Sequence, residues 1–250
     1  MTKLKVASKR VRPLLGTFVE ISLYSEGDFS DLVTDTFEFG QRLEKIFNVH
    51  DINSEISLFN LGKSQEPGSH LLSVLNLAQD LEIRSNHAFS SRDEENFLNL
   101  NGIAKGYIVD KLVENILRQV PHLQGVINAG GDLRFFNTDH RVANIRMGNK
   151  PIFREISLNK NALATSSVAI SQSDANSSTN YHKPLARGLR ADHTVTVLAD
   201  YCAIADALTK VALFGSLATI EKCASVFSSQ IMIFDAQGDI VEVYSEHEVK

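Results

Sequence analysis

The chain has 250 residues, 43% of them hydrophobic and 22% charged, which is typical of an ordinary globular protein. Its net charge of −5 gives no electrostatic footprint for nucleic acid or for anionic membranes. We therefore expect no nucleic-acid partner. No apolar stretch has the length of a transmembrane span, so we expect none.

The N-terminus carries charge but no following apolar run, which argues against a signal peptide. We expect a cytoplasmic protein, or a periplasmic one if a leader has been removed. Two cysteines, Cys202 and Cys223, are too few for a disulfide framework and have no metal-ligand spacing. We expect both to be thiols packed on helices, with a single bridge as the alternative.

Hydrophobic periodicity predicts the elements of the N-terminal half. In chain order these are a strand at 17–24, a helix within 29–50, a turn or short helix at 51–60, a loop at 62–68, a helix at 69–85, a polar loop at 86–96, and a helix that follows Gly106 and ends before Pro121.

The C-terminal half adds strand pairs and two more helices. We expect strands at 124–128, 133–136, 142–147, 152–158 and 193–198, a polar loop at 172–179, helices at 202–214 and 217–227, and a terminal hairpin at 231–244. This mixture indicates an α+β or mixed α/β fold, and no linker divides residues 1–250 into separate domains.

A glycine-rich stretch at 99–110 precedes the helix that ends before Pro121. Gly102 and Gly106 bracket a predicted turn that carries Lys105. A helix start with unpaired N–H groups and a lysine can bind phosphate. The alternative is a tight turn with a solvated lysine, and the stretch alone does not decide between them.

Two further segments allow both a structural and a chemical interpretation. Residues 128–132, Asn-Ala-Gly-Gly-Asp, form either a plain hairpin tip or a backbone that a ligand approaches closely, with Asn128 or Asp132 as its polar contact. Asp206, Thr209 and Lys210 share one face of a predicted helix. There, Asp206 either pairs with Lys210 or ligates a hard cation such as Mg²⁺.

Taken together, six segments in this order resemble the ApbE family, the FAD:protein FMN transferases. They are Leu15-Gly16-Thr17, Asn53-Ser-Glu-Ile-Ser-Leu-Phe-Asn60, Asn101-Gly-Ile-Ala-Lys-Gly-Tyr-Ile-Val-Asp110, Val126-Ile-Asn-Ala-Gly-Gly-Asp132, Ala162-Leu-Ala-Thr-Ser-Ser167 and Ala205-Asp-Ala-Leu-Thr209.

The resemblance implies a single domain with mixed sheets flanked by helices, which binds FAD as substrate. It implies that FMN passes to a Thr or Ser hydroxyl of a target flavoprotein, that AMP leaves, and that Mg²⁺ assists. His182 and Asp206 would then be catalytic, and Ala162, Asp206 and Thr209 would hold the metal. The residues expected to bind FAD are Gly16, Thr17, Asn60, Gly102, Lys105, Gly106, Asp110, Asn128, Gly130, Gly131, Thr165 and Ser166.

Three departures from the family pattern favour an alternative, a binding module that retains the nucleotide but has lost catalysis. Four positions after Asp206 the family usually has Thr or a small residue, whereas this chain has Lys210. The Asp-Pro element that follows the family's His is Lys-Pro after His182. The segment before the Lys-Gly turn is also shortened, and the chain has no Trp.

Overall fold

A computed structural model describes residues 6–147, 153–167, 185–186, 188–190 and 192–245. Its centre is an eight-stranded sheet in the order β1-β2-β3-β4-β7-β8-β9-β10, and all of its described pairings are antiparallel. The strands are β1 (Val6–Leu14), β2 (Thr17–Tyr24), β3 (Gln124–Ala129), β4 (Asp132–Phe136), β7 (Ala162–Ser167), β8 (Thr194–Ala199), β9 (Gln230–Phe234) and β10 (Ile240–Tyr244).

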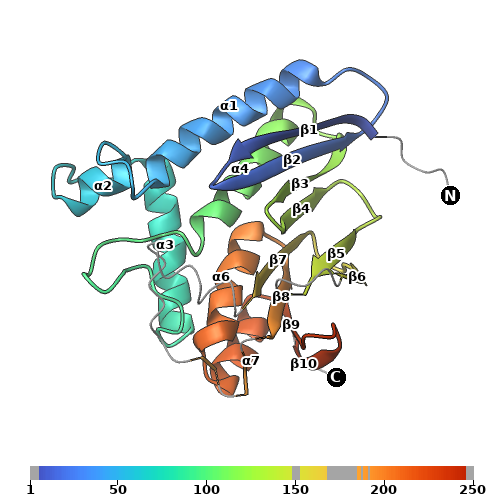
Figure 1. Cartoon of the computed structure of the whole chain (residues 1–250). Helices are drawn as coiled ribbons and strands as arrows, with labels where there is room; N and C mark the ends of the chain where they lie inside the picture. Colours follow the sequence, from blue (N-terminus) through green and yellow to red (C-terminus); the bar gives the residue numbers. More distant parts are fainter. Residues whose placement is uncertain (1–5, 148–152, 168–184, 187, 191, 246–250) are drawn as a thin grey trace.

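Six helices are described, and Figure 1 shows α1, α4 and α6 along one face of the sheet. Their bounds are α1 (Ser30–Phe47), α2 (Glu55–Asn60), α3 (Ser69–Arg84), α4 (Ala104–Gln119), α6 (Cys202–Phe214) and α7 (Leu217–Val226). None of these helices is long and apolar enough to cross a membrane. Helices gathered beside an antiparallel sheet confirm the predicted α+β class.

Alternation along the strands supplies apolar residues to both faces of the sheet. On β3, Ile127 belongs to the main core under the helices, whereas Val126 belongs to a second cluster on the opposite face. That second cluster is completed by a separate hairpin of β5 (Val142–Arg146) and β6 (Phe153–Ser157), which Figure 1 places across the sheet from α6.

Most predicted elements are present with shifts of a few residues at their ends, but the sequence interpretation missed β1; the predicted loop at 172–179 lies outside the described residues. Its residues alternate poorly and include three basic side chains and Pro13. Such residues suit the edge of a sheet, and β1 is an edge strand that pairs only with β2 among the described strands. The two cysteines are both free and buried, as expected.

Candidate active site

Lys105 and Asp132 form an ion pair between the first turn of α4 and the start of β4. Lys105 Nζ lies 2.8 Å from Asp132 Oδ2, and the side chains are 32% and 2% exposed. Burial alone would lower the pKa of Lys105, but the carboxylates of Asp132 and Asp206 outweigh it and raise that pKa. Lys105 therefore stays a cation at neutral pH.

A second ion pair lies on α6, where Asp206 and Lys210 are one turn apart. Lys210 Nζ lies 2.8 Å from Asp206 Oδ1, and these side chains are 17% and 3% exposed. The same ammonium is 3.1 Å from Thr209 Oγ1 and 3.4 Å from Ser166 Oγ on β7. Asp206 Oδ2 is buried and has no hydrogen-bond partner among the described residues. One carboxylate oxygen of Asp206 is therefore held by Lys210, and no described residue donates to the other.

The two ion pairs form one electrostatic cluster of two carboxylates and two ammonium groups, called here the charge cluster (Lys105, Asp132, Asp206 and Lys210). Asp206 interacts electrostatically with both Lys105 and Asp132, and Lys210 interacts with Asp132. Burial raises the pKa of Asp132, and the Asp206 charge acts in the same direction against the opposing effect of Lys105. The formal charges of the cluster sum to zero when all four groups are ionised.

The structure corrects the expected turn between Gly102 and Gly106. Gly106 lies inside the first turn of α4, which begins at Ala104, and Gly102 is buried in the turn before it. A Cβ atom on Gly106 would stand 2.4 Å from Cys202 O and 2.7 Å from Ala203 N. Gly106 therefore lets the N-terminus of α6 approach α4, which brings Lys105 and Asp206 near each other.

Asp110 contacts that same helix terminus. Its carboxylate accepts hydrogen bonds of 2.9 Å from Cys202 N and from Ala203 N, and Arg134 Nε lies 3.2 Å away. A carboxylate in this position caps the helix and complements its dipole. Burial raises the pKa of Asp110 to about 6, although the two N–H donors and Arg134 oppose that shift. Asp110 thus already supplies an anion at the α6 N-terminus.

The Gly130–Gly131 tip and the Gly16–Thr17 turn meet beside Asp132. Gly130 N donates to Phe18 O at 3.3 Å, and a Cβ on Gly130 would stand 2.6 Å from Thr17 Oγ1. Gly130 and Gly131 have φ angles of +63° and +103°, which favour glycine. Asn128 Oδ1 accepts from Gly131 N at 2.9 Å, so this amide caps the tip.

On β7, two predicted site residues contact neighbouring hydroxyl groups. Thr165 Oγ1 lies 3.1 Å from Thr196 Oγ1, and Ser166 Oγ lies 2.8 Å from Thr209 Oγ1. Thr209 also donates to the Asp206 carbonyl at 2.7 Å. The hydroxyl of Ser166 therefore joins β7 to the Asp206–Lys210 pair.

The predicted Mg²⁺ ligands do not fit one ion. Mg²⁺ needs oxygen ligands at about 2.1 Å in near-octahedral geometry. The expected carbonyl comes from the Ala162–Ala164 segment of β7, and Ala162 lies four residues, or about 13 Å along a strand, before Ser166, which Thr209 contacts. An ammonium group also occupies Asp206 Oδ1. Among the described residues, no group of three or more His, Cys, Asp or Glu side chains could hold a metal.

The side chain of Asn60, on α2, is bonded to the backbone of Leu98. Asn60 Nδ2 donates to Leu98 O at 3.0 Å, and Leu98 N donates to Asn60 Oδ1 at 2.8 Å. These bonds hold α2 against the segment before α4. Asn60 and Asn99 line a groove of about 390 Å³ there. His182 lies outside the described residues.

Asp132 and Lys210 complete the charge cluster, although neither was among the predicted site residues. The sequence suggested Asp132 only as a possible polar contact of the hairpin tip, and Lys210 only as a possible i,i+4 partner of Asp206. Asp132 directly follows the glycine pair and begins β4, where its side chain is buried. Because buried carboxylates are almost always paired, this position predicts a cationic partner, which is Lys105. Arg134 was missed entirely, because alternation places it on a strand without indicating its contact with Asp110.

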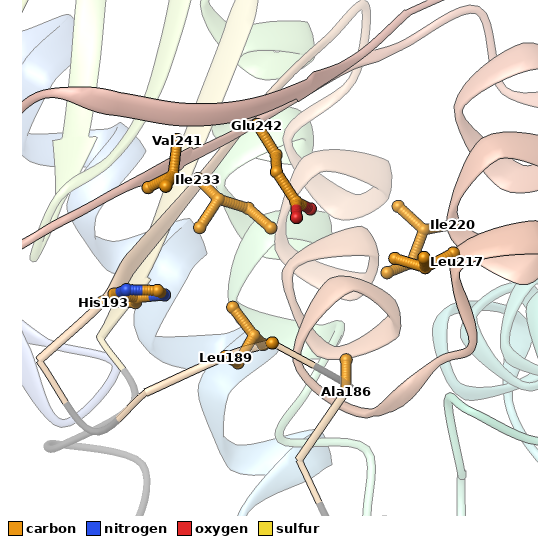
Figure 2. A pocket seen from close by; sticks show the side chains of 9 residues that line it. Ala186, Leu189, His193, Leu217, Ile220, Ile233, Val241 and Glu242 are labelled. Atoms are coloured by element: carbon orange, nitrogen blue, oxygen red, sulfur yellow. The ribbon is translucent and has the colours of Figure 1, made fainter.

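A separate small cavity, between α7 and β9–β10, is lined by none of the predicted site residues that the structure describes. Figure 2 shows His193 and Glu242 among apolar side chains that include Leu217, Ile220 and Ile233. Its volume of about 30 Å³ is only two to three times the roughly 10–15 Å³ that one buried water molecule needs. The cavity is therefore too small for a nucleotide.

Comparison with solved structures shows the same fold in three proteins. The ApbE protein of Thermotoga maritima is 18% identical, with a TM-score of 0.69, over 96% of this chain and 97% of its own. The flavin transferase ApbE of Vibrio cholerae is 16% identical, with a TM-score of 0.69 and the same coverage of 96% and 97%. The flavinyl transferase ApbE of Pseudomonas stutzeri, in its apo form, is 14% identical, with a TM-score of 0.69 and coverage of 97% and 95%.

Comparison with curated protein sequences finds no match. The sequence model of the ApbE family matches residues 90–232, which is more than half of the chain and contains all four groups of the charge cluster. The ordered motifs, the shared fold and this match lead to one conclusion: the chain belongs to the ApbE family.

Proposed function

We propose that this protein transfers FMN from FAD to a Thr or Ser hydroxyl of a target flavoprotein and releases AMP. Membership of the ApbE family supports this proposal, as does a fold shared with proteins named as flavin transferases. The observation that carries it is Asp206, a buried carboxylate with one oxygen held by Lys210 and the other without a donor among the described residues.

The reaction needs a base and positive charge at a diphosphate. The target hydroxyl oxygen attacks the phosphorus atom of the FMN half, the P–O bond to the AMP phosphate breaks, and AMP leaves. The hydroxyl proton passes to Asp206 Oδ2, an oxygen that accepts no hydrogen bond from the described residues. Lys105 and Lys210 offset the charge that develops on the phosphate oxygens.

The turns beside Asp132 suit a ligand that approaches the backbone closely. The Gly16–Thr17 turn lies against the Gly130–Gly131 tip. Lys105 pairs with Asp132, the residue after Gly131. Glycines without side chains leave room for a flat or extended ligand over the peptide planes. We assign this tip to the FAD site.

The family resemblance implies Mg²⁺ at Asp206, but the residues as arranged do not fit that ion. Lys210 occupies one carboxylate oxygen, where the ion would have to bind. No step of the proposed transfer is therefore routed through a metal. FAD is the substrate, and the target flavoprotein is the partner.

A second candidate function is a binding module that holds FAD without transferring FMN. The Asp206–Lys210 ion pair favours it, because the ammonium group occupies one oxygen of the carboxylate that the transfer would use as its base. Both functions place the nucleotide at the charge cluster, so they differ only in turnover.

Turnover separates the two functions. The purified protein is incubated with FAD and candidate target flavoproteins, in Mg²⁺ and in EDTA, and the products are read as protein-bound flavin fluorescence and as free AMP. Asp206→Asn, whose fold is checked by circular dichroism, is the matched control. Transfer by the native protein and none by Asp206→Asn supports the proposal. FAD binding without AMP release on a target that another ApbE protein modifies supports the binding module.

A further inference from the structure

The Asp206–Lys210 pair differs from an ordinary helical ion pair in its surroundings. Asp80 and Arg84 on α3 have the same i,i+4 spacing, yet both side chains are nearly half exposed. Lys210 instead reaches between α6 and β7, where its ammonium group has three oxygen atoms within 3.4 Å. A lysine ammonium has three hydrogens to donate, so Asp206 Oδ1, Thr209 Oγ1 and Ser166 Oγ can satisfy all three.

Those three oxygens are a carboxylate and two hydroxyls, the types of ligand that a hard cation takes. The ammonium group therefore stands within the set of oxygens that would otherwise surround a small cation. A metal ion bonded to Asp206 would lie a few ångströms from Lys210 Nζ, since both would share one carboxylate. Like charges at that distance in a buried site repel strongly.

The charge balance points the same way. Asp132 and Asp206 are almost fully buried, and Lys105 and Lys210 neutralise both. A divalent cation would add two positive charges to a cluster that is already neutral. The other ammonium group, Lys105, comes from α4 and interacts with Asp206 as well. Cations from two helices thus flank the carboxylates.

From this geometry we infer that the Lys210 ammonium replaces a divalent cation at Asp206, so that this site takes no metal ion. The inference does not rest on the proposed function, because exclusion of the metal follows from the cluster itself. Lys210 is then the residue that determines whether the site takes a metal ion.

The test is direct binding of Mn²⁺, followed by electron paramagnetic resonance, to the purified protein without FAD. Lys210→Thr removes the charge, opens space and supplies an oxygen. Lys210→Met removes the charge but fills the space and supplies no oxygen ligand. We expect the native protein not to bind Mn²⁺ at Asp206, Lys210→Thr to gain at least roughly tenfold in affinity, and Lys210→Met to gain less. Adding Asp206→Asn to Lys210→Thr should abolish the gain.

Mn²⁺ binding by the native protein that Asp206→Asn removes would overturn the inference. Equal Mn²⁺ affinity of the native protein and a folded Lys210→Thr variant would also overturn it, because the ammonium would not then be what excludes the ion. If Lys210→Thr does not fold, the native titration with its Asp206→Asn control decides alone. Failure to transfer FMN would refute the proposed function and leave these metal titrations unchanged.

Discussion

The contact between α4 and α6 predicts the sign of a single substitution, Gly106→Ala. In an open helix this change stabilises the fold by about 0.5–1 kcal/mol, because alanine loses less backbone entropy than glycine. Here the new Cβ would stand 2.4 Å from Cys202 O and 2.7 Å from Ala203 N. These are backbone atoms of α6 and cannot rotate away, so one of the two helices must shift.

Overpacking of this kind costs about 1–3 kcal/mol, and the shift also strains the two bonds from Cys202 N and Ala203 N to Asp110. The net effect is a loss of stability. For a chain of this size each kcal/mol lowers Tm by about 2–4 °C. We expect Gly106→Ala to lower Tm by several degrees in a thermal unfolding scan followed by circular dichroism.

Gly40→Ala on α1 is the matched control. A Cβ there would meet Leu14 Cδ2 at 2.7 Å and Leu112 Cδ2 at 3.2 Å, which are ends of flexible side chains. Those side chains can adopt other rotamers, so Gly40→Ala should cost clearly less than Gly106→Ala. An unchanged or higher Tm for Gly106→Ala would refute the close approach of α4 and α6, and with it the packing that brings Lys105 near Asp206.

Three further predictions concern Asn60, Asp110 and Arg84. Asn60→Ala removes two hydrogen bonds to Leu98 and should lower the free energy of urea unfolding by about 1–3 kcal/mol; lower FAD affinity at unchanged stability would instead make Asn60 a ligand-binding residue. Burial raises the pKa of Asp110 from 3.8 to about 6, so the folded protein holds the carboxyl proton more tightly than the unfolded chain does. This proton therefore adds roughly 3 kcal/mol to the free energy of unfolding at low pH, and the gain is lost as the pH rises from about 4 to about 6. Asp110→Asn should flatten that fall in a series of urea titrations, and an unchanged pH profile would contradict the burial penalty. Arg84→Ala breaks an exposed pair with Asp80 and should change the unfolding free energy by less than about 1 kcal/mol; a larger loss in the same titration would contradict its exposed setting.

Local sequence was enough to predict most elements, because alternation and helical spacing report which face of a segment is buried. Strand β1 was missed because an edge strand buries less and tolerates the charges and the proline it contains. Gly106 was assigned to a turn, since a glycine required by a neighbouring helix has the same local signature as a glycine required by a turn.

The site was predicted in part for a similar reason. The i,i+4 spacing on one helix placed Asp206 beside Lys210. The partners of this pair come from β7 and α4, and no local pattern specifies contacts between elements so far apart in the chain. The carboxylate of Asp110 shows the same limit, because its role depends on Cys202, which is 92 residues away.

FAD titration measures whether the charge cluster holds a flavin diphosphate. Quenching of flavin fluorescence on titration gives the affinity of the native protein and of Lys105→Met and Lys210→Met, with AMP and ADP as competitors and circular dichroism as the check on folding. We expect the native protein to bind FAD, ADP to compete better than AMP, and each folded lysine variant to bind FAD at least roughly tenfold more weakly. FAD affinity that is absent from the native protein, or unchanged in both folded variants, would contradict this expectation.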